Sequence, residues 1–382
     1  MPFFVHVLGL AVLAQGTSEF MLSGLVPGLA RDLSVSPSAA AGLTSAYAIG
    51  MIAGAPATAA LGARWRHRPA LAGFLAAFVL VHAVGALTTD FTVLFATRVV
   101  AAIVNAGFLA VALPFAASLA GPARQARATA VLLSGVTLSC VVGVPAGAVL
   151  GERYGWRWAF WAVAALCLPA LALVFRSAPA ERAAGRARNT VRVRDDLRTL
   201  RSRRLRTTLA VAALVNGATF ASFAFLAVIA TDVAQLPPAA VPGLLAAFGA
   251  GAFLGVTAAG RTAVRTPPAL GGLLAGWFLL AATAAHPVPL FLLAAVQGAL
   301  SFGLGTTLVS RVLSLATDAP SLGGAFATVA LNTGAFLGPL LAASVTAQVY
   351  GDPRGALWTS AALAATAAAV DTLTRCARRK LP

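Results

Sequence analysis

Long apolar stretches recur from one end of the 382-residue chain to the other. An apolar helix of about 20 residues is long enough to cross the ~30 Å hydrocarbon core of a bilayer. Turn-forming pairs such as Gly121-Pro122 and Pro237-Pro238 separate the stretches. We therefore predict twelve membrane-spanning helices, at residues 4–27, 39–60, 70–89, 91–114, 126–150, 155–175, 207–231, 239–260, 268–285, 288–316, 322–349 and 355–374.

The amino-acid composition excludes a soluble globular protein. Charged residues make up 10% of the chain and hydrophobic residues 59%, whereas a soluble protein covers its surface with charge. One segment is the exception, since eleven arginines fall within residues 176–206. We predict an all-α integral membrane protein in which two six-helix bundles, residues 1–175 and 207–382, are joined by a basic cytoplasmic linker at residues 176–206.

The distribution of positive charge predicts the orientation in the membrane. If the N-terminus is cytoplasmic, 23 of the 28 Lys and Arg residues lie on the cytoplasmic side. Arg31, Arg153, Arg157 and Arg354 then lie outside, and Arg98 lies within a span. The positive-inside rule therefore predicts that both termini are cytoplasmic. The net charge of +17 is then explained by the orientation of the protein in the membrane. We therefore expect no nucleic-acid partner.

The two halves of the sequence are similar to each other. Tyr154-Gly155, Arg157 and Trp161 recur in the same order as Tyr350-Gly351, Arg354 and Trp358. Chance alignment of two alanine-rich sequences is the weaker explanation, because the shared residues are Tyr, Gly, Arg and Trp rather than common apolar residues. Six spans repeated in parallel are typical of a transporter whose substrate site lies between the two halves.

Glu19 lies deep in the first predicted span. Gln15, Ser18 and Ser23 share its helical face, so this polar stripe is predicted to face the interior of the bundle. An ionised carboxylate is costly there, and we expect Glu19 to take up protons near neutral pH. The alternative is a structural carboxylate held in place by a neighbour.

Arg98 is the one basic residue that we predict to be buried in a span, and Asn105 follows it on the same helical face. A buried arginine must find carboxylates, carbonyl groups or water. It could lower the proton affinity of Glu19 in one conformation and restore it in another. It could also bind backbone carbonyl groups and hold helices in register, and both roles are compatible.

Small residues recur every fourth position in the fifth predicted span and let a neighbouring helix approach closely. These positions are Gly135, Ser139, Gly143, Gly147 and Gly151, with Pro145 among them. The eleventh span repeats the pattern more weakly, with Ala330, Gly334, Gly338 and Ala342. We predict that this ridge serves helix packing and gating.

Uncharged polar and aromatic residues within the spans are candidates for a substrate pocket. They are Gln15, Asn105, Asn216, Phe220, Phe223, Gln297, Asn332 and Phe336. An apolar pocket with a few amides suits an amphiphilic ligand with little or no charge. Plain helix packing is the alternative for each of them.

Enzyme chemistry finds no support in the sequence. A Gly-Lys-Ser loop of the Walker type is absent, so ATP-driven transport has no motif here. The four histidines, His6, His67, His82 and His286, are far apart and lack the spacing of metal ligands. We expect a protein that is not an enzyme and that needs neither a metal nor a cofactor.

Several of these segments resemble the major facilitator superfamily, and the likeness covers essentially the whole chain. Gly16-Thr17-Ser18-Glu19-Phe20 resembles the first-span signature of bacterial drug:proton antiporters. Arg98 with Gly107 is similar to the fourth-span motif implicated in proton coupling, and Gly135 through Gly147 resembles the fifth-span antiporter motif. The loop between the second and third spans departs from the family, with Ala63 where an Asp is usual.

The sequence is most similar, within that superfamily, to actinomycete chloramphenicol-resistance exporters. The resemblance implies proton-coupled efflux of a small amphiphilic antibiotic, a phenicol such as chloramphenicol, by alternating access in the bacterial cytoplasmic membrane. The expected partners are the small-molecule substrate, protons and the lipid bilayer, and we expect the protein to function as a monomer. A sugar or metabolite exporter of the same fold is the main alternative, and a non-transporting membrane sensor or scaffold is a third.

Overall fold

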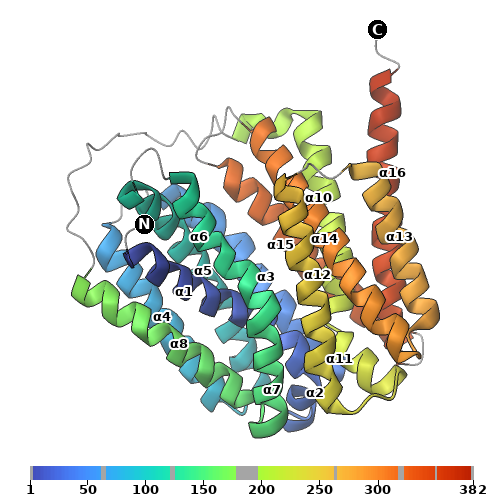
Figure 1. The fold of residues 1–382 in the computed structure, drawn as a ribbon, viewed down its shortest axis with the longest axis horizontal. Helices are drawn as coiled ribbons and strands as arrows, with labels where there is room; N and C mark the ends of the chain where they lie inside the picture. The colour runs from blue at the N-terminus through green and yellow to red at the C-terminus, as the bar shows by residue number, and fades with distance from the viewer. Residues whose placement is uncertain are drawn as a thin grey trace.

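The computed structural model describes residues 3–61, 66–120, 125–177, 197–261, 265–316, 322–348 and 351–379. All regular elements in these ranges are helical, and twelve helical segments are long and apolar enough to cross a membrane (Figure 1). The predicted all-α membrane fold is therefore confirmed. The altered loop position Ala63 and most of the basic linker lie outside the described residues.

The first half of the chain contains six spans. They are α1 (Phe3–Phe20) with α2 (Leu22–Asp32), α3 (Pro37–Leu61), α4 (His67–Leu87), α5 (Phe91–Ala120), α6 (Gln125–Leu138) with the π-helical turn η3 (Ser139–Gly143) and α7 (Val144–Tyr154), and α8 (Trp156–Ser177). Each observed span overlaps a predicted one. The predicted first and fourth spans ended too early, because their helices continue to Asp32 and Ala120.

The second half repeats this organisation. After the short turn η4 (Thr199–Arg201), its spans are α10 (Arg203–Phe223) with α11 (Leu226–Val228) and the π-helical turn η5 (Ile229–Val233), α12 (Val241–Arg261) preceded by η6 (Pro238–Ala240), α13 (Thr266–Thr283), α14 (Pro287–Leu315), α15 (Gly323–Gln348) and α16 (Arg354–Arg379).

The first span is broken at Met21, two residues after Glu19. At the break the backbone N–H of Gly24 bonds to the Met21 carbonyl, three residues back, at 3.1 Å. The Ser23 hydroxyl donates to the Phe20 carbonyl at 3.0 Å. The sequence predicted one continuous helix here, whereas the structure has α1 and α2 meeting at the point where the candidate carboxylate lies.

Helix starts follow local side-chain chemistry. The backbone N–H of Val93 donates to Asp90 Oδ1 at 2.9 Å and thereby caps α5. This hydrogen bond to the charged form lowers the pKa of the exposed Asp90 carboxyl from its ordinary value. Ser36 Oγ accepts from the backbone N–H of Ala39 at 3.1 Å in the same way at the start of α3. Polar caps therefore mark where these spans leave the apolar region.

The duplication seen in the sequence is present in the packing. In the first half α1 packs on α6 and α3 packs on α5; in the second half α10 packs on α15 and α12 packs on α14. Gly155 and Gly351 occupy matching turns, and both have positive backbone φ angles, 90° and 79°, which glycine adopts without strain. The exact domain boundaries around the linker stay a prediction.

The two halves meet mainly at the end of the molecule opposite the chain termini, which we call the distal end (Figure 1). There α2 contacts α11 and α7 contacts α12, and α3 and α15 also pack against each other between the halves. Ser45 Oγ donates across the interface to the Phe336 carbonyl at 2.9 Å. We call the opposite end, where α1 begins and α16 finishes, the terminal end.

The hydrophobic core is shared at the distal end and divided at the terminal end. One buried cluster runs through both halves and includes Leu29, Val144 and Leu245. Two further clusters lie at the terminal end and stay within their own halves, one around Phe4 and Leu132 and the other around Leu205, Val312, Ala316 and Ala327. The two halves therefore share one core at the distal end. At the terminal end each half has a core of its own.

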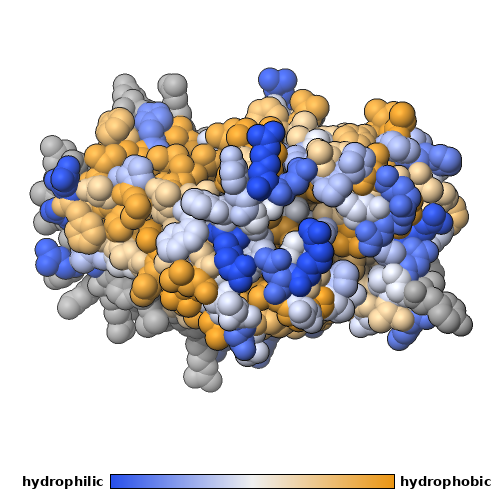
Figure 2. All heavy atoms as spheres, turned by 90° about the horizontal axis from the view of Figure 1, so that it is seen from below, coloured by the Kyte–Doolittle hydropathy of each residue, from blue (hydrophilic) through white to orange (hydrophobic). Residues whose placement is uncertain are grey.

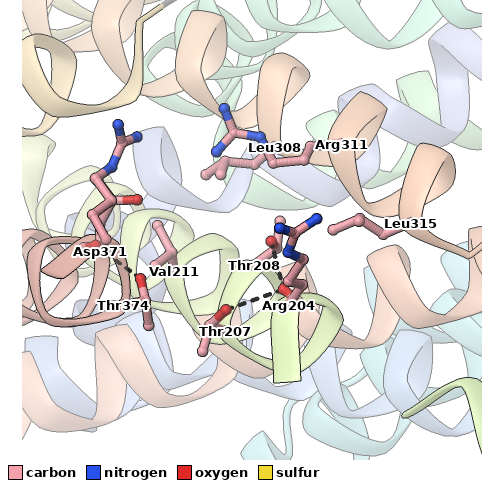
Figure 3. A pocket seen from close by; sticks show the side chains of 10 residues that line it. Arg204, Thr207, Thr208, Val211, Leu308, Arg311, Leu315, Asp371 and Thr374 are labelled. Carbon is pink, nitrogen blue, oxygen red and sulfur yellow. Dashed lines mark hydrogen bonds and ion pairs between the residues drawn. The ribbon is translucent and has the colours of Figure 1, made fainter. Parts of the chain in front are cut away.

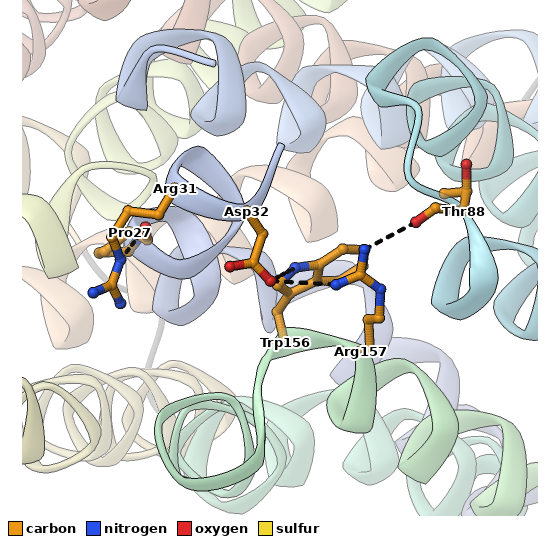
Figure 4. A network of polar contacts seen from close by, with 6 residues as sticks. All are labelled: Pro27, Arg31, Asp32, Thr88, Trp156 and Arg157. Carbon is orange, nitrogen blue, oxygen red and sulfur yellow. Dashed lines mark hydrogen bonds and ion pairs between the residues drawn. The ribbon is translucent and has the colours of Figure 1, made fainter. Parts of the chain in front are cut away.

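A polar network ties the ends of three spans together at the distal end (Figure 4). Asp32 Oδ2 accepts from Trp156 Nε1 at 3.0 Å and from Arg157 Nη1 at 3.2 Å. Arg157 also donates to the Thr88 carbonyl at 3.3 Å and lies over the Trp156 ring. Figure 2 views this end, where hydrophilic side chains gather across the middle. The network links the ends of the first, third and sixth spans.

Candidate functional site

Arg98 of α5 is buried in the middle of the first half, with 1% of its surface exposed. Its Nη1 donates to Ser18 Oγ at 2.8 Å and its Nη2 donates to the Ser18 carbonyl at 2.6 Å. The guanidinium also lies 4.8 Å from the ring centroid of Tyr47 and 5.6 Å from that of Phe160. Two hydrogen bonds and two aromatic faces therefore fix its orientation.

His82 of α4 completes this cluster, and its tautomer follows from its partners. A carbonyl oxygen only accepts, so the 2.7 Å bond to Phe78 requires the proton on His82 Nδ1. His82 Nε2 then accepts from the Ser18 hydroxyl at 2.6 Å. The Ser18 hydroxyl accepts in turn from Arg98, so one chain of hydrogen bonds runs from the guanidinium through Ser18 to the imidazole.

Glu19 lies directly after Ser18, near the break in the first span. It is partly exposed, whereas Gln15, Ser18 and Ser23 on the same stripe are almost fully buried. Its carboxylate makes no ion pair with Arg98 in the part of the chain that the structure describes, although the two charges are close enough to interact electrostatically. Arg98 is bound to the residue beside the carboxylate instead.

Gln15 and Asn105 differ in how well their amides are satisfied. Gln15 is 1% exposed, and neither its amide nitrogen nor its amide oxygen has a hydrogen-bond partner among the described residues. Buried amides without partners are rare and costly, which makes Gln15 a candidate for contact with a ligand. Asn105 Nδ2 lies 3.9 Å from Met51 Sδ, a weak contact. Of the two candidates, Gln15 has the stronger geometric case for substrate contact.

The small-residue ridge of the fifth span packs against the first span, which carries Glu19. A methyl group built on Gly135 would lie 2.7 Å from the Gly9 carbonyl oxygen and 2.9 Å from the Leu13 nitrogen. One on Gly143 would lie 3.0 Å from Thr17 Cβ, and one on Gly147 3.2 Å from Met21 Cβ. The ridge therefore sets the position of the first span within the same half.

Ser139 and Gly151 of the ridge also face the first span. Ser139 faces Gly16, Gly151 faces Leu25, and Pro145 lies at the start of α7, just after the π-helical turn. Another side of the fifth span meets the other half, because Gly249 of α12 lies against the backbone of Cys140 and Val141. The fifth span thus lies between the span that carries Glu19 and the second half of the molecule.

A row of aromatic rings leads from the first span into the second half. Ring centroids are 5.9 Å apart for Phe20 and Phe220, 6.1 Å for Phe220 and Phe223, and 4.8 Å for Phe223 and Phe248. The row ends at Phe302, 6.2 Å from Phe248. Phe220 and Phe223 therefore lie together beside the residue that follows Glu19.

The other candidates of the second half make packing contacts. Asn216 donates to the Leu331 carbonyl at 2.7 Å, Gln297 to the Leu273 carbonyl at 2.9 Å, and Asn332 to the Thr328 carbonyl of its own helix at 2.9 Å. Phe336 lies at the interface with α3, where its carbonyl accepts from Ser45. These contacts fit the helix-packing alternative, and none brings the amides to Glu19.

Sequence reasoning missed His82 and Tyr47 as parts of the site. Both lie in apolar spans without a polar stripe, so hydropathy gives no sign of which side chain faces Arg98. The available signal was Arg98 itself, since a buried guanidinium needs acceptors and aromatic faces. No group of three or more His, Cys, Asp or Glu side chains in the described ranges is arranged to hold a metal ion.

Comparison with known proteins places the chain and its fold in a family. Residues 8–276 match the model of the Major Facilitator Superfamily. The chain belongs to the major facilitator superfamily. Two solved structures with this fold are a bacterial homolog of the human lysosomal transporter Spinster, in an inward-facing and unoccupied conformation, and the D-xylose-proton symporter. Their TM-scores are 0.75 and 0.74, at 16% and 14% identity, covering 96% and 95% of this chain and 95% of each of theirs.

Curated relatives in the superfamily are similar over nearly the whole chain. A chloramphenicol resistance protein of Streptomyces lividans is 52% identical over 372 residues, which cover 96% of this chain and 95% of the relative. A chloramphenicol efflux pump of Mycobacterium tuberculosis is 30% identical, with 88% and 85% covered. The chain is therefore a multi-pass membrane transporter for a small molecule rather than an enzyme, and its predicted resemblance to chloramphenicol-resistance exporters is confirmed.

Proposed function

We propose that this transporter exports chloramphenicol or a related phenicol in exchange for protons, by alternating access. The proposal rests first on the 52% identity with the chloramphenicol resistance protein of Streptomyces lividans. The observation that carries the mechanism is Glu19, a partly exposed carboxylate beside the buried Arg98–Ser18–His82 chain. We place the protein in the bacterial cytoplasmic membrane as a monomer with both termini in the cytoplasm.

Glu19 is proposed to be the proton carrier. A neutral carboxylic acid costs less to bury than a carboxylate, so proton binding permits Glu19 to be enclosed when the halves rearrange. Arg98 cannot follow it, because Ser18 holds both terminal nitrogens of the guanidinium. The fixed positive charge favours release of the proton wherever Glu19 gains access to water.

The arrangement of the halves suits the state that loads substrate. With the termini in the cytoplasm, the shared core closes the outer side and the divided core lies on the inner side. Substrate would enter from the inner side while Glu19 releases its proton there. Separation at the distal end would then expose the same residues to the outside.

The aromatic row provides contacts suited to a phenicol. Phe20, Phe220 and Phe223 offer ring faces next to Glu19, and such faces favour an aromatic substrate ring. The unpartnered amide of Gln15 lies one helical turn before Glu19 and can bind the polar hydroxyl or amide groups of the same molecule. Side chains of this composition suit a ligand with little net charge.

Antibiotic susceptibility tests the substrate. Expression in a sensitive bacterial host is expected to raise the inhibitory concentration of chloramphenicol and its close analogues, with no comparable change for aminoglycosides or tetracyclines. Host cells that carry the empty vector provide the baseline, and membrane content is measured by immunoblot. An unchanged phenicol response at normal membrane content would contradict the proposed substrate.

Arg98→Lys is expected to reduce transport by about tenfold or more, the equivalent of ~1.4 kcal/mol in the transport cycle. Lysine keeps the charge but loses the planar fork that binds two atoms of Ser18 and lies between two rings. The measurement is chloramphenicol export from loaded cells at matched expression. Arg31→Lys, at an exposed arginine, is the control and retains wild-type export. Full export by Arg98→Lys would mean that charge alone suffices.

A further inference from the structure

A hollow of about 340 Å³ lies at the terminal end of the second half, between the ends of α10, α14 and α16 (Figure 3). It is lined by Arg204, Thr207, Thr208, Val211, Leu308, Arg311, Leu315, Asp371, Thr374 and Arg375. Glu19, the Arg98 cluster and the aromatic row contribute nothing to it. The hollow is therefore separate from the proposed transport site.

The hollow has an excess of positive charge. Arg375 Nε and Asp371 Oδ2 form an ion pair at 2.7 Å, so these two charges balance each other. The guanidinium groups of Arg204 and Arg311 have no ion pair or hydrogen bond within the described chain, although both line the same space. Two uncompensated guanidinium groups facing one cavity favour an anion with several oxygen acceptors.

The rest of the lining adds an apolar floor and no competing anion. The hydroxyl groups of Thr207, Thr208 and Thr374 donate to carbonyls of their own helices at 2.8–3.0 Å, so the arginine N–H groups are the free donors. Val211 and Leu308 beneath them are buried. A cationic rim over an apolar floor fits a phosphate that carries hydrocarbon chains better than it fits free phosphate.

The position of the hollow along the membrane-spanning helices also favours a lipid as its ligand. Arg204 lies in the first turn of α10, Arg311 in the last turns of α14, and Arg375 near the end of α16. The apolar, span-length helices begin or end at Arg203, Leu315 and Arg375, so we infer that the hollow lies at the level of the lipid headgroups. Basic pockets between spans at this level bind anionic headgroups. We propose that this hollow is a binding site for the phosphate headgroup of an anionic phospholipid.

The proposal predicts a specific stabilisation by anionic lipid. The full-length purified protein in neutral detergent is heated with added phosphatidylglycerol, phosphatidylcholine or inorganic phosphate, and the unfolding midpoint is measured. Phosphatidylglycerol raises the midpoint because it bridges three helices of the folded state, and the other two additions leave it unchanged at equal concentration. An equal rise with inorganic phosphate would show a free-anion site, and no rise with phosphatidylglycerol would remove the site altogether.

Matched variants separate this hollow from general attraction to a basic surface. Arg204→Gln/Arg311→Gln is expected to lose most of the phosphatidylglycerol shift. Arg203→Gln/Arg261→Gln removes the same charge from exposed positions outside the hollow and keeps the shift. Equal losses in both would overturn the proposal. Native mass spectrometry of the wild type and both variants gives a second readout, with retained phosphatidylglycerol expected in the wild type and in the surface variant only.

Discussion

Glu19→Gln is expected to abolish uphill export of chloramphenicol while leaving its binding to the purified protein within about twofold of wild type, a free-energy change of less than ~0.5 kcal/mol. Glutamine keeps the size and hydrogen-bonding groups of the protonated carboxyl, but it cannot carry a proton. One proton exchanged for a neutral molecule supplies ~2.3 kcal/mol per 100 mV, which sustains a concentration ratio of about 50-fold. In the variant this ratio falls to one. The measurement is accumulation of labelled chloramphenicol in energised inside-out vesicles.

A matched control separates the role of Glu19 from the mere loss of a carboxylate. Glu152→Gln changes an exposed glutamate near the end of α7 and keeps the full accumulation ratio. Accumulation by Glu19→Gln at the wild-type level would assign the proton to another group. Loss of binding together with accumulation would make Glu19 a substrate contact instead.

The second large effect on transport is expected from a substitution in the small-residue ridge of the fifth span. Gly135→Leu is expected to insert into the membrane normally but to lose nearly all transport, because even its first side-chain carbon would meet the backbone at Gly9 and Leu13. Overpacking of this kind costs about 1–3 kcal/mol in well-packed cores. Here that strain displaces the helix that positions Glu19 and Ser18. Chloramphenicol export at matched membrane content is measured together with the unfolding midpoint in detergent.

Ser134 provides the control one residue away. It is exposed on the same helix and its hydroxyl donates only to the Val131 carbonyl of that helix, so Ser134→Leu adds the same kind of side chain without touching α1. We expect wild-type export and a wild-type unfolding midpoint. If Gly135→Leu behaves in the same way as Ser134→Leu, the packing of the fifth span on the first is not required for transport.

The spans and their duplication could be predicted because hydropathy and repeated residues report them directly. The repeat around Tyr154-Gly155 and Tyr350-Gly351 corresponds to matching turns with positive φ angles. The polar stripe of the first span was also informative, since Gln15, Ser18 and Ser23 are buried. Small residues at every fourth position predicted a close helix contact, although the sequence did not identify the first span as its partner.

Rotations and breaks of the helices could not be predicted in the same way. Apolar side chains face lipid and protein interior alike, so hydropathy did not reveal that His82 points to Ser18 or that Gln297 points to α13. The break at Met21, where the Ser23 hydroxyl donates to the Phe20 carbonyl, and the π-helical turn before Pro145 have no distinct sequence pattern. Both features lie where the proposed site is assembled.

The most direct test of proton-coupled export is proton movement driven by the substrate itself. Proteoliposomes that contain chloramphenicol and a pH-sensitive dye are diluted into drug-free buffer at equal pH, with potassium and valinomycin clamping the membrane potential. Exchange predicts that the lumen becomes acidic as chloramphenicol leaves, and that Glu19→Gln gives no acidification. Chloramphenicol efflux through the wild type without any change in lumenal pH, or equal acidification in wild type and Glu19→Gln, would contradict the account.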